Sequence, residues 1–361
     1  MRYARRDLLA ALAFLPFVQG RARASSAQDR FVACARKADG AFAAAVLDDA
    51  GAVSSVLPLP GRGHGAAIAP DGKRVVVFGR RSADFMVAFS MDAPEDAVQL
   101  TARAGRHYYG HGCFSSDGEY LFAAENAYDD ARGVIGVYDA ADNYKRLGEF
   151  SSGGVGPHEI ILLRDGRTLA VANGGIETHP DFPRRKLNIA DMAPNLSYLD
   201  AETGALLERA AAPAALHKLS LRHLTQTNDG AVWVGGQYEG PPERRAPLIG
   251  VHRRGNAMAF ITEPSPTAAL RNYVGSIASS ADGAFAAVAS PRGGVLQIWR
   301  AADRRFVVQY ALADVCGVSG GQSGFTASDG AGRLWRNNEL LAEETGWSWD
   351  NHIVAARSPG I

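Results

Sequence analysis

Short apolar runs alternate with Asp-Gly pairs along most of the chain. Five segments share this layout, beginning at His64, His111, His158, His223 and Ser276, and a sixth, weaker copy surrounds Asp329-Gly330. An Asp-Gly pair between two strand-like runs is typical of a β-hairpin closed by a type I′ turn. We therefore predict a hairpin in each segment, followed in most copies by a third strand.

The hairpins recur at a nearly constant interval. His64 and His111 are 47 residues apart, and so are His111 and His158, whereas later intervals are longer because of insertions near residues 178–195 and 241–247. A repeat of about 45 residues with three or four strands is typical of a propeller blade. Helical periodicity is nearly absent after the N-terminal segment, which excludes a helical solenoid. The pattern predicts an all-β propeller.

Both ends of the chain supply strands that belong to none of the six copies. Residues 31–59 contain three strand-like runs, and the C-terminus adds one more, DNHIVAAR, from Asp350 to Arg357. Joining the C-terminal strand to the three N-terminal strands closes the ring and leaves no open sheet edge. We predict a single seven-bladed domain over residues 25–361, whose last blade mixes both termini, with six or eight blades as alternatives.

The first 24 residues differ in composition from the rest. Arg5-Arg6 precedes an apolar run from Leu8 to Val18, and residues 22–24 read Ala-Arg-Ala, which fits an export cleavage site. Such a run is too short to span a bilayer, which needs about 20 residues, so residues 1–24 are predicted to be a signal peptide. The Arg-Arg pair resembles a twin-arginine signal, with an ordinary signal peptide as the alternative. We expect a periplasmic mature protein without a membrane span.

Net charge, cysteine content and missing motifs limit the partners, disulfides and cofactors that the sequence predicts. Outside the signal segment the chain has 33 basic and 37 acidic residues, and this mildly acidic body argues against nucleic acid. Three cysteines, Cys34, Cys113 and Cys316, do not form a disulfide framework, and whether two of them pair is left open. Dinucleotide-binding and haem-attachment motifs are missing from the sequence, so we expect neither NAD nor haem.

Five of the nine histidines occupy one position of the repeat. Four lie six or seven residues before an Asp-Gly turn and the fifth lies in the C-terminal strand: His64, His111, His158, His223 and His352. The innermost strands of a propeller line its channel, so we predict that these imidazoles converge on the axis as metal ligands. Neutral imidazole suits transition metals such as iron and copper. The alternative is that each histidine caps its own blade, as in WD-type propellers, although the Trp-Asp partner is missing.

The second strand of each blade returns to the mouth where the first began, which adds polar side chains near the histidines. We predict that these side chains bind a cofactor or a small anionic ligand: Arg62, Arg80, Arg106, Glu125, Asn126, Asn173, Arg222 and Arg292. Arginine favours carboxylates and phosphates through paired hydrogen bonds. Cys113 is a candidate soft ligand or a small buried residue. His179 is expected near this mouth, whereas His217 and His252 fit surface or loop positions.

Long stretches of the chain resemble an uncharacterised bacterial family of twin-arginine-exported propeller proteins, a domain of unknown function. The matching stretches include RHYYGHGCFSSDG (106–118), GVGPHEIILLRDG (154–166) and the segment over residues 171–200. The resemblance implies a seven-bladed propeller related to the quinoprotein-dehydrogenase-like and lactonase-like groups. Its members are often encoded beside imelysin-type, iron-regulated proteins, which implies imelysin-like partners in periplasmic iron uptake. It assigns no catalytic residue.

Three functions follow from these observations. The first is a periplasmic metal-binding accessory protein in iron or copper acquisition and homeostasis. The second is an enzyme, either a metal-assisted lactonase-like hydrolase or a quinoprotein-dehydrogenase-like enzyme. The third is a protein-interaction scaffold with a polar, plugged channel. The sequence names neither the metal nor a substrate, and it does not decide the oligomeric state or whether the protein is an enzyme.

Overall fold

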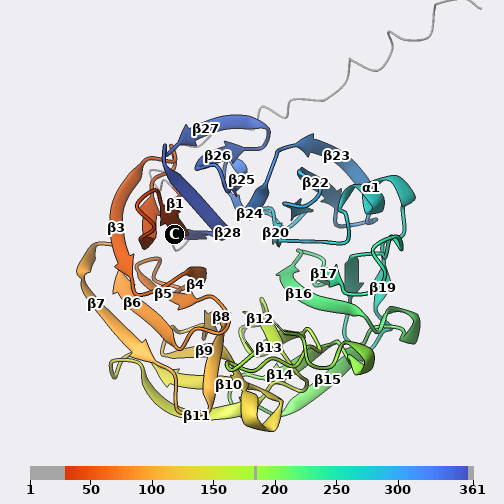
Figure 1. Ribbon diagram of the computed structural model, residues 1–361, viewed down its shortest axis with the longest axis horizontal. Helices are drawn as coiled ribbons and strands as arrows, with labels where there is room; N and C mark the ends of the chain where they lie inside the picture. The colour runs from red at the N-terminus through yellow and green to blue at the C-terminus, as the bar shows by residue number, and fades with distance from the viewer. Residues whose placement is uncertain (1–28, 183–184, 357–361) are drawn as a thin grey trace, which may run out of the picture.

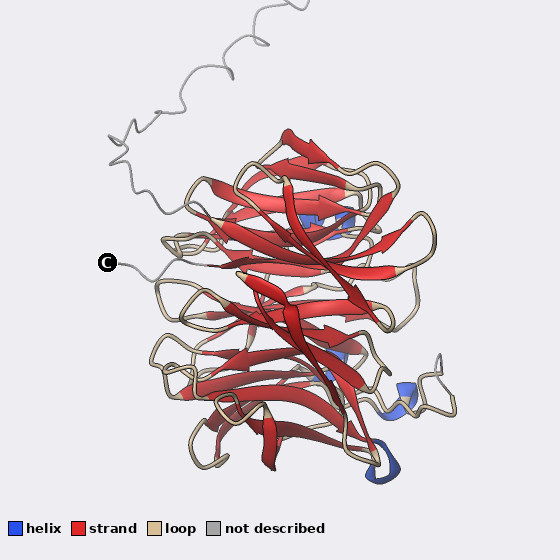
Figure 2. Cartoon of the chain, turned by 90° about the vertical axis from the view of Figure 1, so that its left-hand side faces the viewer, coloured by secondary structure: helices blue, strands red, loops and turns tan. Residues whose placement is uncertain are grey.

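The computed structural model describes residues 29–182 and 185–356, so the predicted signal peptide, residues 1–24, lies outside the described residues. Seven four-stranded antiparallel sheets form a ring around a central axis (Figure 1). Seen from the side, the loops gather on two opposite faces of the ring (Figure 2). The prediction of an all-β, seven-bladed propeller is confirmed.

Each blade runs from an innermost strand at the axis to an outermost strand at the rim. The first blade comprises β4 (Gly63–Ile68), β5 (Arg74–Gly79), β6 (Phe85–Ser90) and β7 (Ala93–Thr101). The second comprises β8 (Arg106–Phe114), β9 (Tyr120–Ala127), β10 (Arg132–Asp139) and β11 (Lys145–Ser151). The third comprises β12 (Pro157–Leu162), β13 (Thr168–Asn173), β14 (Asn195–Asp200) and β15 (Leu206–Ala211). The next three comprise β16 (Leu219–Gln226), β17 (Val232–Tyr238), β18 (Ile249–His252) and β19 (Ala259–Phe260); β20 (Ser276–Ser279), β21 (Phe285–Ser290), β22 (Val295–Arg300) and β23 (Phe306–Ala311); and β24 (Val315–Gly321), β25 (Gly324–Asp329), β26 (Arg333–Arg336) and β27 (Glu339–Glu343).

The last blade is built from both ends of the chain. It comprises β1 (Arg30–Lys37), β2 (Phe42–Leu47), β3 (Val53–Leu59) and the innermost strand β28 (Trp347–Ala356). In Figure 1 the red β1 and the blue β28 lie side by side, and their pairing brings Phe31 opposite Ala355. The predicted closure of the ring is therefore confirmed, and this pairing removes the open edge that β1 would otherwise present.

In the part of the chain that the structure describes, four short helical segments lie between strands: α1 (Pro264–Ala269) and the 3-10 turns η1 (Tyr128–Asp130), η2 (Ile189–Asp191) and η3 (Ala214–Leu216). Within the described ranges, no helix is long and apolar enough to cross a membrane.

The Asp-Gly turns join the first two strands in blades one to five, but their geometry differs from the prediction. Only the glycine of each pair has positive φ, for example 69° at Gly72 and 72° at Gly118, whereas a type I′ turn needs positive φ at both central residues. The aspartate instead accepts a hydrogen bond from the N–H two residues on, as Asp71 does from Lys73 at 2.7 Å. The sixth pair, Asp329-Gly330, lies between β25 and β26 and thus closes the next hairpin of its blade.

The core lies between neighbouring blades, where apolar side chains of adjacent sheets meet. Phe78, Tyr108 and Leu121 fill one such interface, between the first and second blades, and each is fully buried. Trp233 and Trp299 are the largest fully buried side chains. Burying a large apolar side chain contributes about 1.5–3 kcal/mol, so the blade interfaces hold the ring together. The three cysteines are unpaired, which answers the question that the sequence left open.

Candidate metal centre

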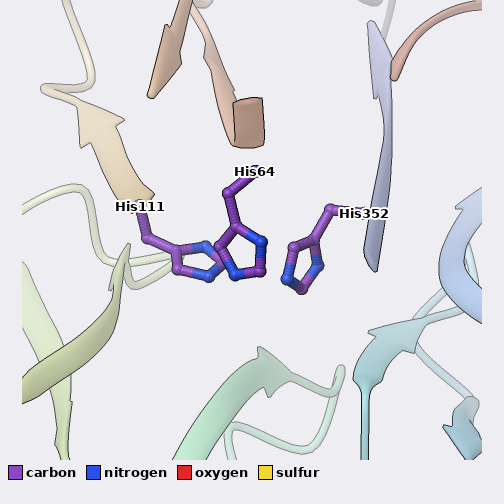
Figure 3. Close-up of side chains that lie close together, drawn as sticks. All are labelled: His64, His111 and His352. Atoms are coloured by element: carbon purple, nitrogen blue, oxygen red, sulfur yellow. The ribbon is translucent and has the colours of Figure 1, made fainter. Parts of the chain in front are cut away.

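Five innermost strands bring five histidines together on the propeller axis. We call His64, His111, His158, His223 and His352 the His crown; they come from β4, β8, β12, β16 and β28. The ring centroids of neighbouring members lie 4.6–5.9 Å apart. Figure 3 shows His64, His111 and His352 pointing toward one another. All five side chains are buried, with exposures of 1–8%.

Local breaks in strand pairing turn these histidines toward the channel. In each of the five strands, the pairing with the next strand of the blade shifts register at or beside the histidine. β20, which carries no histidine, pairs without a shift, while β24 shifts at Cys316. An extra residue in one strand interrupts the backbone hydrogen bonding between the two strands and changes the direction in which its side chain points. The bulges therefore point the imidazoles inward.

Glycine allows the rings to approach closely. Gly110 has φ of 98°, and a Cβ at this position would lie 2.6 Å from Cδ2 of His64. A Cβ at Gly65 would lie 2.9 Å from Nδ1 of His111. Since glycine alone adopts this positive φ without cost and adds no side chain, the residues preceding and following the histidines are part of the site.

The crown offers two overlapping sets of ligand atoms. One set is His64, His111 and His352, the other is His111, His158 and His223, and the donor atoms within each set lie within 4.8 Å of one another. Two nitrogens on one ion lie at most about 4.2 Å apart, because each is about 2.0–2.1 Å from the metal. The sets are thus close to the spacing of metal ligands, and His111 belongs to both.

Four crown nitrogens are buried without a hydrogen-bond partner among the described residues: Nε2 of His111, His223 and His352, and Nδ1 of His158. A buried polar atom left unpaired costs about 1–3 kcal/mol. Native proteins contain few such atoms, and a concentration of them at one point calls for a ligand. These nitrogens fit a transition-metal ion, which accepts the imidazole lone pairs.

Two carboxylates from other blades orient the crown. Nδ1 of His64 lies 3.1 Å from Oδ1 of Asp350, and Nδ1 of His223 lies 3.2 Å from Oε2 of Glu159. Asp350 also forms an ion pair with Arg62. A carboxylate on the far nitrogen of an imidazole fixes its tautomer and raises its basicity as a ligand. Asp350 provides this for His64, whereas Glu159 is largely protonated near neutral pH and orients His223 as a neutral hydrogen-bond partner.

Burial keeps the crown neutral. It lowers the pKa of His223 to about 3, with Arg222 acting in the same direction, and it lowers the pKa values of the other four crown histidines as well. A neutral imidazole has a free lone pair for a metal. Burial also raises the pKa of Glu159 to about 8. Burial alone would raise the pKa of Asp350, but hydrogen bonding to His64 and the charge of Arg62 hold it well below its usual range.

Cavities lie on both sides of the crown. One, of about 240 Å³, is lined by His64, His158 and His223 together with arginines at the face where the innermost strands begin. The other, of about 650 Å³, is lined by residues that follow the histidines along the same strands, Cys113 among them. Cys113 is in neither set of ligand atoms, and burial raises its pKa to about 12.

Four of the eight residues predicted to bind a small ligand lie beside the crown. Arg80, Arg222 and Arg292 line the smaller cavity, and Arg62 pairs with Asp350 next to His64. The structure brings these side chains together as the strand argument predicted. That they bind a ligand stays a prediction.

The structure places the other four away from the cavity, because partners in the blades hold them. Arg106 reaches out to Glu149 on the outermost strand, at 3.0 Å, and Glu125 accepts hydrogen bonds from Tyr138 and Arg146 inside the blade. Arg106 and Glu125 were both expected to line the mouth of the channel, and that expectation is wrong. The amide groups of Asn126 and Asn173 also bond to residues other than those of the cavity, the first to His107 and Thr178, the second to Ser152 and Asn195.

Sequence reasoning missed Asp350 and misplaced two histidines. Asp350 lies two residues before His352 on the same strand, but the pairing of β28 with β1 shifts register across these residues, so simple strand alternation does not place Asp350 beside the crown. His252 is buried, 1% exposed, and bonds to the hydroxyl of Tyr198 at 2.7 Å, so its predicted surface or loop position is wrong. His179 lies beside Asp129, outside the cavity, whereas His217 is exposed as predicted.

Comparison with known proteins places the chain in a family. The family model described as "Protein of unknown function (DUF1513)" matches residues 57–356. The chain belongs to this family. A comparison with curated proteins finds no match.

Solved structures resemble this DUF1513 member in fold. Hydrazine synthase of Kuenenia stuttgartiensis has a TM-score of 0.60 at 14% identity, covering 82% of this chain and 91% of that chain. The β-propeller domain of Cps50 (Swd1) from Myceliophteria thermophila has a TM-score of 0.58 at 12% identity, covering 82% and 93%. At such low identity these likenesses show the propeller fold alone.

Proposed function

We propose that this DUF1513 protein is an exported, periplasmic protein that binds a transition-metal ion in the His crown. The observation that carries the proposal is the group of four buried imidazole nitrogens without partners at the point where five blades meet. A metal ion would use these nitrogens as ligands and remove the cost of leaving them unpaired. The predicted signal peptide supports the periplasmic location.

The hydrogen bonds of the crown differ from those expected of histidines that only cap their own blades. A capping histidine bonds within its own blade, but His64 of the first blade bonds to Asp350 of the closing blade, and His223 of the fourth bonds to Glu159 of the third. Among the described residues, the remaining three crown side chains form no hydrogen bonds. The crown therefore couples blades around a central point instead of stabilising each blade separately.

The proposed role is accessory: the protein handles iron or copper during acquisition and homeostasis. Support comes from the nitrogen-only donor set, which suits both metals, and from the resemblance to a family often encoded beside imelysin-type, iron-regulated proteins. Imelysin-like proteins are the partners that this role implies.

The test is metal analysis of protein exported in its native host and purified without chelator. We expect about one iron or copper ion per chain, and titration of metal-free protein with Fe²⁺, Cu²⁺ and Zn²⁺ should give saturable binding. His111→Ala, which removes a ligand from both sets, should lose most of the metal, whereas exposed His217→Ala should bind normally. Circular dichroism checks that both variants fold. Protein that holds no stoichiometric metal and takes none up would overturn the proposal.

A second candidate is a metal-assisted hydrolase of the lactonase-like kind. It is favoured by the cavity of about 240 Å³ that adjoins three crown histidines and leaves room for a substrate beside the metal. Turnover of a lactone panel by the metal-loaded protein, lost in His111→Ala and kept in His217→Ala, would support it. A metal-loaded protein without turnover would leave the accessory role as the account of the crown.

A further inference from the structure

The smaller cavity beside the crown, which we call the Arg cavity, carries an excess of positive charge. Among its lining side chains are five cationic groups and a single carboxylate: Arg80, Arg81, Lys186, Arg222, Arg292 and Glu239. Like charges in a confined, poorly solvated space repel strongly. The cavity therefore has the electrostatics of a site for a negatively charged ligand.

The contacts within the Arg cavity leave most of this charge unpaired. Glu239 pairs with Lys186 and lies 3.9 Å from the guanidinium of Arg222. The second contact of Arg222 is to a neutral group, the hydroxyl of Ser220, at 2.8 Å. Arg292 lies over the ring of Tyr273, with its Cζ atom 4.5 Å from the ring centroid.

Arg80 and Arg81 have still fewer partners. Among residues 29–182 and 185–356, neither side chain forms a hydrogen bond or has a carboxylate oxygen within 4.0 Å. Burial lowers the pKa values of Arg80 and Arg222, which reflects the cost of holding these charges out of water. Guanidinium groups in such a position favour carboxylate or phosphate, because each can give two parallel hydrogen bonds.

The Arg cavity and the crown share a wall. His64, His158 and His223 line the cavity together with the arginines. An anion held by the guanidinium groups would therefore also lie against the imidazole rings of the crown. A volume of about 240 Å³ holds a small molecule of the size of a dicarboxylate, a tricarboxylate or a phosphate.

We infer that the Arg cavity binds a small oxyanion with two or more negative charges, and that one of its oxygens completes the coordination of the metal in the crown. The metal would then be taken up as a complex with that anion. The second half of this inference rests on the proposed function, whereas anion binding by the cavity does not need the metal. Polycarboxylates and phosphate share the required chemistry.

The test is isothermal titration calorimetry of the mature, metal-free protein with citrate, inorganic phosphate and acetate. We expect saturable binding of citrate or phosphate, and at least tenfold weaker binding of singly charged acetate. The comparison of citrate with phosphate identifies which oxyanion the site prefers. Arg80→Gln combined with Arg222→Gln should weaken binding at least tenfold, and Arg81→Gln serves if the double variant does not fold. Arg300→Gln is the control, because Arg300 is exposed and pairs only with Asp303.

Repeating the titration with metal-loaded protein tests the link to the crown. The preferred anion should bind at least fivefold more tightly with metal, and by reciprocity the metal should bind equally more tightly with the anion. No binding of citrate or phosphate to the metal-free protein, or binding unchanged by metal, overturns the inference while metal uptake by the crown stands. Anion binding without any metal uptake overturns the proposed function but leaves the cavity as an anion site.

Discussion

At the scale of single residues, the site depends on carboxylates that the sequence pattern marks only weakly. Asp350 and Glu159 each reach a crown histidine from a different blade, so neither contact can be deduced from the spacing within one repeat. The histidines themselves were predictable, because they recur at one position of the repeat. Their partners were not, because they depend on which blades become neighbours at the axis.

Asp350→Asn should weaken metal binding while leaving the fold intact. The amide keeps the size of the side chain but removes the charge that supports His64 as a ligand, and losing such an outer partner costs about 10–100-fold in metal affinity. Competition titration against a chromophoric chelator measures the change. Asp303→Asn, on the exposed surface of the fifth blade, is the control. Equal affinity in the two variants would show that Asp350 does not support the crown.

Glu149 gives the fold a dependence on acid pH. Hydrogen bonds from Arg106 and Arg146 hold its pKa at about 2, below the usual 4.5. The ionised carboxylate of Glu149 therefore stabilises the fold fully above about pH 4.5, and this stabilisation is lost as the pH falls toward 2. Glu149→Gln should lower the free energy of unfolding at pH 7 by about 1–3 kcal/mol.

Urea unfolding between pH 7 and pH 2.5 measures this effect. The difference between wild type and Glu149→Gln should stay constant from pH 7 to about pH 4.5 and shrink below that, whereas exposed Glu119→Gln should follow the wild type throughout. A constant difference across this range would contradict the assignment of a depressed pKa to Glu149.

At the scale of strands, the sequence predicts the hairpins well and the bulges not at all. Asp-Gly pairs mark turns because glycine supplies the positive φ and aspartate bonds to the backbone that follows. The bulges leave no such signature, since an extra residue in a strand looks like any other strand residue. The argument from strand direction placed Glu125 and Asn126 at the mouth, although hydrogen bonds hold both side chains inside the protein.

Gly110→Ala tests whether the bulge in β8 shapes the crown. Alanine at φ of 98° is strained, and its Cβ would collide with His64; such strain costs about 1–3 kcal/mol. We expect a lower melting temperature together with weaker metal binding. Gly148→Ala in β11 is the matched control, because no atom lies within 4 Å of the added Cβ. If both variants behave like the wild type, close packing of the rings is not required.

At the scale of the whole molecule, closure of the ring creates the site. The strand that completes the seventh blade also carries His352 and Asp350, so folding of the last blade and assembly of the crown are one event. The orphan strands at the two ends made this closure predictable. Which ligand such a site would select was not predictable, because that depends on the combined charge of side chains from many blades.

Deleting residues 347–361 should therefore destroy the fold and not merely the site. Without β28, the inner edge of β1 is left unpaired, and the truncated chain should lack a cooperative thermal transition in circular dichroism. Deleting residues 357–361 leaves β28 complete and should melt like the full-length mature protein. A cooperative transition of unchanged midpoint in the longer deletion would contradict the role of β28 in closing the ring.

X-ray absorption spectroscopy of the metal-loaded protein shows whether the five histidines form one metal site. If they do, we expect a first shell dominated by imidazole nitrogens at about 2.0–2.1 Å from the metal. We also expect His111→Ala to lower the imidazole count and His217→Ala to leave the spectrum unchanged. A first shell without imidazole scattering, or one that is the same in both variants, would contradict a single metal site.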